Sequence, residues 1–76
     1  MLNGYVLIQT EVGMAPGVER AIRDVEGVTS VDLVTGPYDV ILTTEADGMH
    51  ELGPLMNRIQ SVRGVARTLT CAVMGS

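Results

Sequence analysis

Several residue types that commonly build catalytic or nucleic-acid sites are absent or rare in this sequence of 76 residues. The chain has no lysine, no tryptophan and no phenylalanine, and it has one cysteine and one histidine. Its formal net charge is -4 at pH 7, and its five basic residues are arginines that are interleaved with acids. A chain of this charge is not attracted to phosphate backbones. We therefore expect no direct contact with nucleic acid.

The rare side chains offer little for metal or cofactor chemistry. Cys71 is alone, which excludes a disulfide within the chain, and we interpret it as a small buried residue. The only carboxylates near His50 in sequence are Asp47 and Glu51, so we interpret His50 as a surface residue rather than a metal ligand. Neither GxGxxG nor GxxxxGK[ST] is present. We expect no cofactor and no metal.

Long apolar runs are also missing. No run approaches the roughly 18 residues of a membrane-spanning helix, and the first residues lack the cationic segment of a secretion signal. We therefore expect a cytoplasmic protein that does not contact a membrane. The length predicts a single domain, residues 1–76, with no DNA-binding domain.

The residues that are present form a repeated pattern. Ile22-x-x-Val25-x-Gly27-Val28 recurs in the second half as Ile59-x-x-Val62-x-Gly64-Val65. A glycine directly after a helical apolar stripe predicts the end of a helix, and the following valine opens an extended segment. Two such units in one small chain predict a split βαβ arrangement.

The periodicity predicts six elements. Strands are expected at 5–10, 28–35, 40–44 and 65–74, and the first helix at 15–26. A second helix, with Asp47 as a plausible N-cap, contains Gly53-Pro54, so it either starts late or kinks there. The order βαββαβ predicts an α+β, ferredoxin-like fold with one antiparallel sheet of order 4-1-3-2 and both helices on one face. The other face also receives apolar residues, so we expect a second subunit to cover it.

The segment Thr35-Gly36-Pro37-Tyr38-Asp39 is the most unusual in the chain. Its residues are turn formers, and a plain hairpin turn accounts for them. The alternative is a binding turn, in which backbone N–H groups face a carboxylate and Asp39 pairs with an ammonium. Those are the two charged groups of a free amino acid.

Two motifs together resemble a known family. Gly36-x-Tyr38-Asp39 before an apolar strand, and Gln60-Ser61-Val62-x-Gly64-Val65-x-Arg67-Thr68-x-Thr70, are similar to the effector-binding (RAM) domain of the Lrp/AsnC, or feast/famine, transcription regulators. The likeness spans about Tyr5 to Met74.

The resemblance implies a βαββαβ domain that pairs through its sheets into an α/β barrel-like dimer and binds amino acids between subunits. By position, Gly36, Tyr38 and Asp39 would receive the ligand's amino and carboxylate groups. Thr68, Thr70 and Gln60 would line the neighbouring wall, and Met49 and Ala72 fall at positions associated with effector response. Pro37 departs from the pattern because it removes a backbone donor, and the helix-turn-helix of full-length members has no counterpart in this sequence.

We therefore expect a regulatory module that binds an amino acid effector and forms a homo-oligomer, as a dimer, octamer or decamer, alone or with full-length Lrp/AsnC relatives. Two alternatives stay open. One is a small dimeric ferredoxin-like enzyme of the monooxygenase or isomerase type, which would need a histidine, an aromatic wall or paired acids inside its cavity. The other is a structural oligomerisation unit without a ligand.

Overall fold

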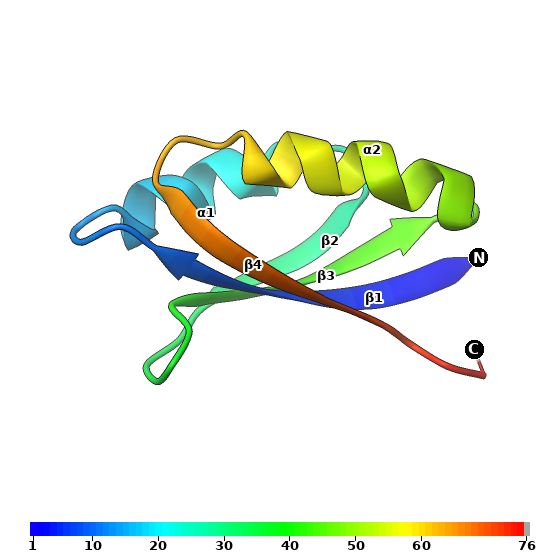
Figure 1. The fold of residues 1–76 in the computed structure, drawn as a ribbon, viewed down its shortest axis with the longest axis horizontal. Coiled ribbons are helices and arrows are strands. Elements are labelled where there is room, and N and C mark those ends of the chain that lie inside the picture. The colour runs from blue at the N-terminus through cyan, green and yellow to red at the C-terminus, as the bar shows by residue number, and fades with distance from the viewer. Residues whose placement is uncertain (76) are drawn as a thin grey trace.

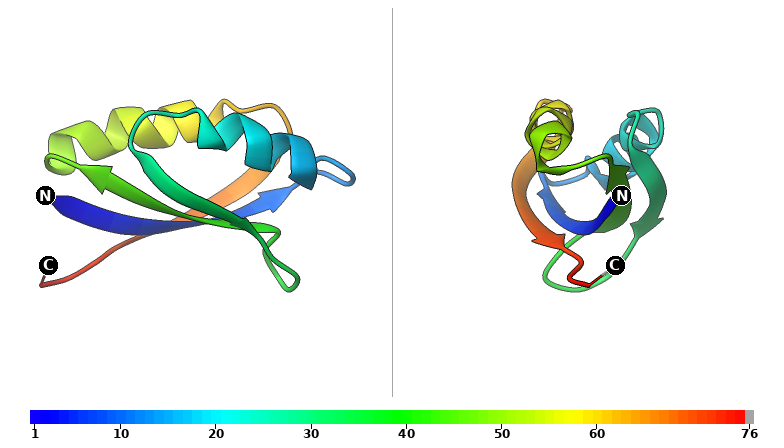
Figure 2. Two further views of the ribbon diagram at one scale, coloured as in Figure 1. Left: turned by 180° about the vertical axis from the view of Figure 1, so that it is seen from behind. Right: turned by 90° about the vertical axis from the view of Figure 1, so that its right-hand side faces the viewer.

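The computed structural model describes residues 1–75, and its elements follow the order βαββαβ. The sheet order β2-β3-β1-β4 is the predicted 4-1-3-2, and all neighbouring strands are antiparallel. Both helices cover one face of the strongly twisted sheet, as Figures 1 and 2 show. The predicted ferredoxin-like fold is confirmed. The elements are β1 (Leu2–Thr10), α1 (Ala15–Arg23), β2 (Val28–Leu33), β3 (Val40–Ala46), α2 (Met49–Gln60) and β4 (Val65–Ala72).

An aliphatic core fills the space between the sheet and the helices. Alternate residues of the two central strands point to the helices, and they meet the apolar stripes of α1 and α2. Burial of each such side chain stabilises the fold by about 1.5 to 3 kcal/mol. This matters in a domain so small that it buries only a limited fraction of its surface. The residues with the least exposed surface are Val6, Ile8, Val18, Ile22, Val40, Leu42, Leu55 and Ile59.

Each helix is followed by a glycine turn that leads into the next strand, and the first helix ends earlier than predicted. α1 ends at Arg23 and not at Glu26 as predicted, because the N–H of Asp24 closes the last turn on Ala21 O. Gly27 then turns the chain with φ +99. Gly64 has the same φ of +99 in the second unit, so the sequence repeat is also a repeat of conformation.

The second helix passes through its proline. α2 runs from Met49 to Gln60 with Pro54 inside it, so of the two predicted alternatives the late start is wrong. Figure 1 shows the helix as continuous through this region. Its N-cap residue is Gly48 rather than Asp47, whose N–H is instead bonded to Glu51 Oε1 at 3.1 Å. Glu51 thus reaches back to a backbone donor that precedes the helix, as the glutamate of a capping box does.

The strands differ from prediction at their ends. β1 begins at Leu2 and β3 continues to Ala46, because these two residues pair with each other. β2 stops at Leu33 and β4 stops at Ala72, two residues short of the prediction in each case. The outer strands therefore end sooner than their alternation suggested, while the central pair extends further.

The sheet face away from the helices carries an apolar row. Leu7 lies between Ile41 of β3 and Leu69 of β4, and Tyr5 lies between Thr43 and Cys71. We call these six residues the open face. Tyr5 and Leu69 are each 49% exposed, and Cys71 is exposed, which corrects its interpretation as a buried residue. No helix in residues 1–75 is long and apolar enough to cross a membrane.

Candidate ligand-binding site

The loop between β2 and β3 holds the first group of predicted site residues. This hairpin loop, residues 34–39, closes with a bond from Val34 N–H to Asp39 O at 2.9 Å. Gly36 is exposed with φ +154, a conformation that L residues rarely adopt. Pro37 offers its carbonyl to Gln9 Nε2 at 2.9 Å. The predicted turn is present, and β1 holds its tip in place.

Asp39 directly precedes Val40, the first residue of β3, and continues its pairing with β1. Its Oδ2 accepts hydrogen bonds from Thr10 N–H at 2.8 Å and from Thr10 Oγ1 at 3.1 Å. Its own N–H is bonded to Ile8 O at 2.9 Å. Within residues 1–75, the other carboxylate oxygen, Oδ1, accepts no hydrogen bond. Asp39 therefore fixes the base of the hairpin loop and retains acceptor capacity for a ligand.

The second group of predicted residues lies where α2 meets β4. Gln60 Nε2 donates to Thr68 Oγ1 at 3.1 Å, and Thr70 Oγ1 donates to Met56 Sδ at 3.0 Å. Thr68 and Thr70 pair with residues of β1 that face the helices, so both hydroxyls lie on the helix side of β4. We call Gln60, Thr68 and Thr70 the wall. Gln60 and Thr68 are in direct contact, and Thr70 lies two residues further along the same face of β4.

Within one chain, β1 separates the hairpin loop from the wall. Ile8 pairs with Val40 on one side and with Thr68 on the other, so a full strand lies between the two groups. Figure 1 shows the hairpin loop projecting below the sheet, away from the helices that cover its upper face. Met49 and Ala72 lie toward the opposite end of the sheet, where Ala72 pairs with Gly4. One chain therefore places the two groups of predicted residues on opposite sides of β1 and not around one pocket.

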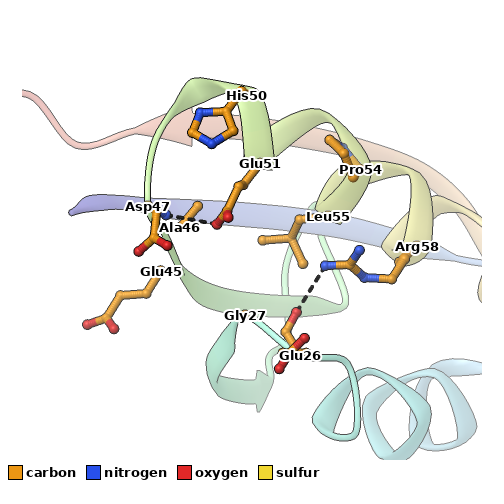
Figure 3. Close-up of a pocket in the computed structure, with 10 residues that line it drawn as sticks. All are labelled: Glu26, Gly27, Glu45, Ala46, Asp47, His50, Glu51, Pro54, Leu55 and Arg58. Carbon is orange, nitrogen blue, oxygen red and sulfur yellow. Dashed lines mark hydrogen bonds between the residues drawn. The ribbon is translucent and has the colours of Figure 1, made fainter.

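A cleft that the sequence did not predict opens beside the N-terminal end of α2. It has a volume of about 430 Å³, and its rim carries the carboxylates of Glu26, Glu45, Asp47 and Glu51. Figure 3 shows His50 at its upper edge, and Arg58 across it donating to Glu26 O at 3.3 Å. His50 is exposed, as its interpretation as a surface residue requires. In the described part of the chain, no three His, Cys, Asp or Glu side chains are grouped to hold a metal ion.

Comparison with known proteins decides the family. The model of the Lrp/AsnC ligand binding domain matches residues 3–76. The chain belongs to this family. It is 30% identical to TTHA0845 from Thermus thermophilus, with a TM-score of 0.93 over 100% of this chain and 96% of that one. It also superimposes on Escherichia coli AsnC with a TM-score of 0.89 at 19% identity, covering 99% of this chain and 52% of AsnC.

The domain also has relatives inside enzymes. The homocitrate synthase of Sulfurisphaera tokodaii is 35% identical over 57 residues, which are 75% of this chain and 12% of the enzyme. The chain thus spans a small part of that relative's length. Among solved structures, the neighbours include transcription regulators and the complex of the regulator NMB0573 from Neisseria meningitidis with L-Met, at 19% identity and a TM-score of 0.86. By its family, the chain is a ligand-binding domain of the Lrp/AsnC type.

Proposed function

We propose that this Lrp/AsnC domain binds a free amino acid between subunits of a homo-oligomer and has a regulatory rather than a catalytic role. The observation that carries the proposal is the division of the predicted site. The hairpin loop and the wall lie on opposite sides of β1 in one chain. A pocket that uses both is completed when the wall of a second copy approaches the hairpin loop of the first.

The open face supports the assembly that such a pocket needs. The row formed by Ile41, Leu7 and Leu69 crosses three strands, and no helix within residues 1–75 covers it. Burial of each of these side chains contributes about 1.5 to 3 kcal/mol, and a domain of this size has few other sources of stability. A second copy packed sheet to sheet would cover the row, in a dimer that can assemble further into an octamer or decamer.

The chemistry of the hairpin loop supports an amino acid as the effector. Asp39 is the only acid in the loop, and it can pair with an ammonium through Oδ1. Backbone N–H groups of the loop and the hydroxyls of Thr68 and Thr70 can donate to a carboxylate. The complex of NMB0573 with L-Met shows an amino acid bound by a protein of this fold. The thermal-shift screen described below would identify which amino acid binds.

The partners follow from the same reasoning. The net charge of -4 opposes direct contact of this domain with DNA. Co-assembly with full-length Lrp/AsnC proteins would bring it to DNA through the partner instead. Its cytoplasmic location and its action alone or with such partners stay predictions. The enzyme alternative gains no support, because the histidine of the cleft in Figure 3 is exposed at its rim rather than enclosed.

A thermal-shift screen across the twenty standard amino acids tests the proposal. A ligand that binds only the folded state stabilises it by about 2.7 kcal/mol at a hundred times its Kd. We expect one amino acid, or a few of similar size, to raise the melting temperature in a concentration-dependent way. A screen in which none does so, with the oligomer intact, would instead support the structural unit without a ligand.

A further inference from the structure

Two consecutive backbone N–H groups at the end of β1 hold the hairpin loop and the turn that leads into the wall. Thr10 N–H donates to Asp39 Oδ2 at 2.8 Å, on the β3 side. Glu11 N–H donates to Gly64 O at 2.8 Å, in the turn between α2 and β4. Successive N–H groups of an extended chain point in opposite directions, which places one such bond on each side of β1.

Further contacts fix each of these bonds in place. On the hairpin side, Thr10 Oγ1 adds a second bond to Asp39 Oδ2, and Gln9 Nε2 holds Pro37 O. On the wall side, Gly64 lies so close to the start of α1 that a Cβ would be 2.8 Å from Met14 Cβ. The hairpin loop is thus tied to β1 by hydrogen bonds, and the turn at Gly64 is tied to α1 by close packing.

The wall is connected to the same turn. Gln60, the last residue of α2, and Thr68, in β4, are joined by a hydrogen bond of 3.1 Å across the turn that contains Gly64. Thr10 also pairs directly with Val65, at the point where the β1–β4 register shifts. A continuous series of bonded or paired groups therefore runs from Asp39 through Thr10 and Glu11 to Gly64 and the wall.

We infer that Thr10 is a positioning residue that couples the hairpin loop to the wall, so that a change at Asp39 is transmitted to Gly64. The inference rests on the proposed function for its purpose, since a ligand ammonium at Asp39 Oδ1 would pull on the same carboxylate whose Oδ2 is held by Thr10. The N–H of Thr10 and the N–H of Glu11 belong to two adjacent planar peptide groups that meet at the Cα of Thr10. A displacement of this Cα therefore moves both peptide groups, and with them the N–H of Glu11 relative to Gly64 O.

Amide hydrogen exchange of the ligand-free protein tests the coupling directly. Thr10→Val removes the hydroxyl but keeps the size and the N–H group. We expect it to accelerate exchange about tenfold at Asp39, and also at Glu11 and Val65, because the hydrogen bond lost is one to a charged group. Thr10→Ser restores the hydroxyl and should restore the exchange rates. Thr29→Val, which removes an exposed hydroxyl bonded to Thr43, is the matched control and should leave these three amides unchanged.

The inference is overturned if Thr10→Val accelerates only Asp39 and leaves Glu11 and Val65 unchanged. It is also overturned if serine fails to restore the rates, or if all amides accelerate together through a loss of global stability. The amino acid screen, run in parallel on wild type and Thr10→Val, separates this result from the proposed function. If no amino acid raises the melting temperature of the wild type, the proposed function is contradicted. The exchange data still test the coupling in that case.

Discussion

Gly64 lies against Met14 with no room for a side chain. A Cβ at Gly64 would be 2.8 Å from Met14 Cβ and 2.9 Å from Val18 Cγ2, and the backbone there has φ +99. The turn that enters β4 is thereby seated on the first turn of α1. The repeated Gly-Val pattern of the sequence thus serves two purposes at this position, a backbone conformation and a close approach.

Gly64→Ala should destabilise the protein strongly. The left-handed backbone costs a non-glycine residue about 1 to 2 kcal/mol, and the clash with Met14 should add about 1 to 3 kcal/mol. Gly13→Ala provides the control, because Gly13 has φ +80 but nothing within 4 Å of a Cβ. Urea unfolding of both variants measures the difference. Equal losses of unfolding free energy would show that the clash is relieved without cost.

Leu69→Asp should dissociate the oligomer. It places a charge in the row of Ile41, Leu7 and Leu69 that we expect a second subunit to cover, where an unpaired carboxylate is costly to bury. Light scattering at micromolar concentration should give the monomer mass for this variant and a larger mass for the wild type. Val12→Asp, at a fully exposed loop residue, should leave the mass unchanged. A stable wild-type monomer would remove the basis for a site between subunits.

Substitutions at Asp39 should separate its two contributions. Asp39→Ala should weaken amino acid binding about 10- to 150-fold, since a hydrogen bond to a charged group contributes about 1.5 to 3 kcal/mol. It should also lower stability, because Thr10 loses the acceptor of two hydrogen bonds. Asp39→Asn keeps an acceptor for Thr10 and should lose affinity with a smaller loss of stability. Calorimetry of binding together with urea unfolding measures both quantities, and an unchanged affinity in Asp39→Ala places the ligand elsewhere.

Pro54→Ala should stabilise the protein. Pro54 lies inside α2, where a proline lacks the N–H that would bond to the fourth residue before it. Alanine restores this bond but also raises the conformational entropy of the unfolded chain, which offsets part of the gain. We expect the free energy of unfolding to rise by about 1 to 2 kcal/mol. Pro16→Ala is the control, because Pro16 is in the first turn of α1 and interrupts no bond. A loss of stability in Pro54→Ala would point to a packing role for the ring.

The isolated domain should not shift a DNA duplex in a gel. Its net charge is -4, and the arginines that supply its positive charge include Arg23 and Arg58, whose guanidinium groups donate to backbone carbonyls of the chain itself. A mobility-shift assay at low salt, where electrostatic binding is strongest, is the most demanding check. A salt-sensitive shift would contradict the expectation.

The fold was predictable because its signals are local and agree with each other. The stripes of α1 and α2, the glycines Gly27 and Gly64, and the apolar central strands each indicate the same topology. The predicted ranges are wrong mainly at the ends of the helices and strands, because pairing with distant residues determines where these elements stop. Leu2 joins β1 only because Ala46 is opposite, and α2 tolerates Pro54 because Leu55 and Ile59 anchor the helix in the core.

The sequence indicates which residues are candidates for the site, but it does not indicate which of them contact one another. The turn chemistry of Gly36 and Asp39 and the alternation of Thr68 and Thr70 can be recognised in the sequence. The bond between Asp39 and Thr10 joins residues far apart in the chain, and no periodicity signals it. The cleft beside α2 could not be predicted for the same reason, since Glu26 joins the acids of β3 and α2 only after folding.

The two tyrosines are the only aromatic side chains of the Phe, Tyr and Trp classes in the protein, and they lie in two different regions of its surface. Tyr5 belongs to the open face, and Tyr38 is half-buried in the hairpin loop. Intrinsic fluorescence of the unlabelled protein therefore arises from one tyrosine on the open face, which would report the proposed subunit association, and one in the hairpin loop. With Tyr5 replaced by leucine, the remaining emission would follow the hairpin loop alone.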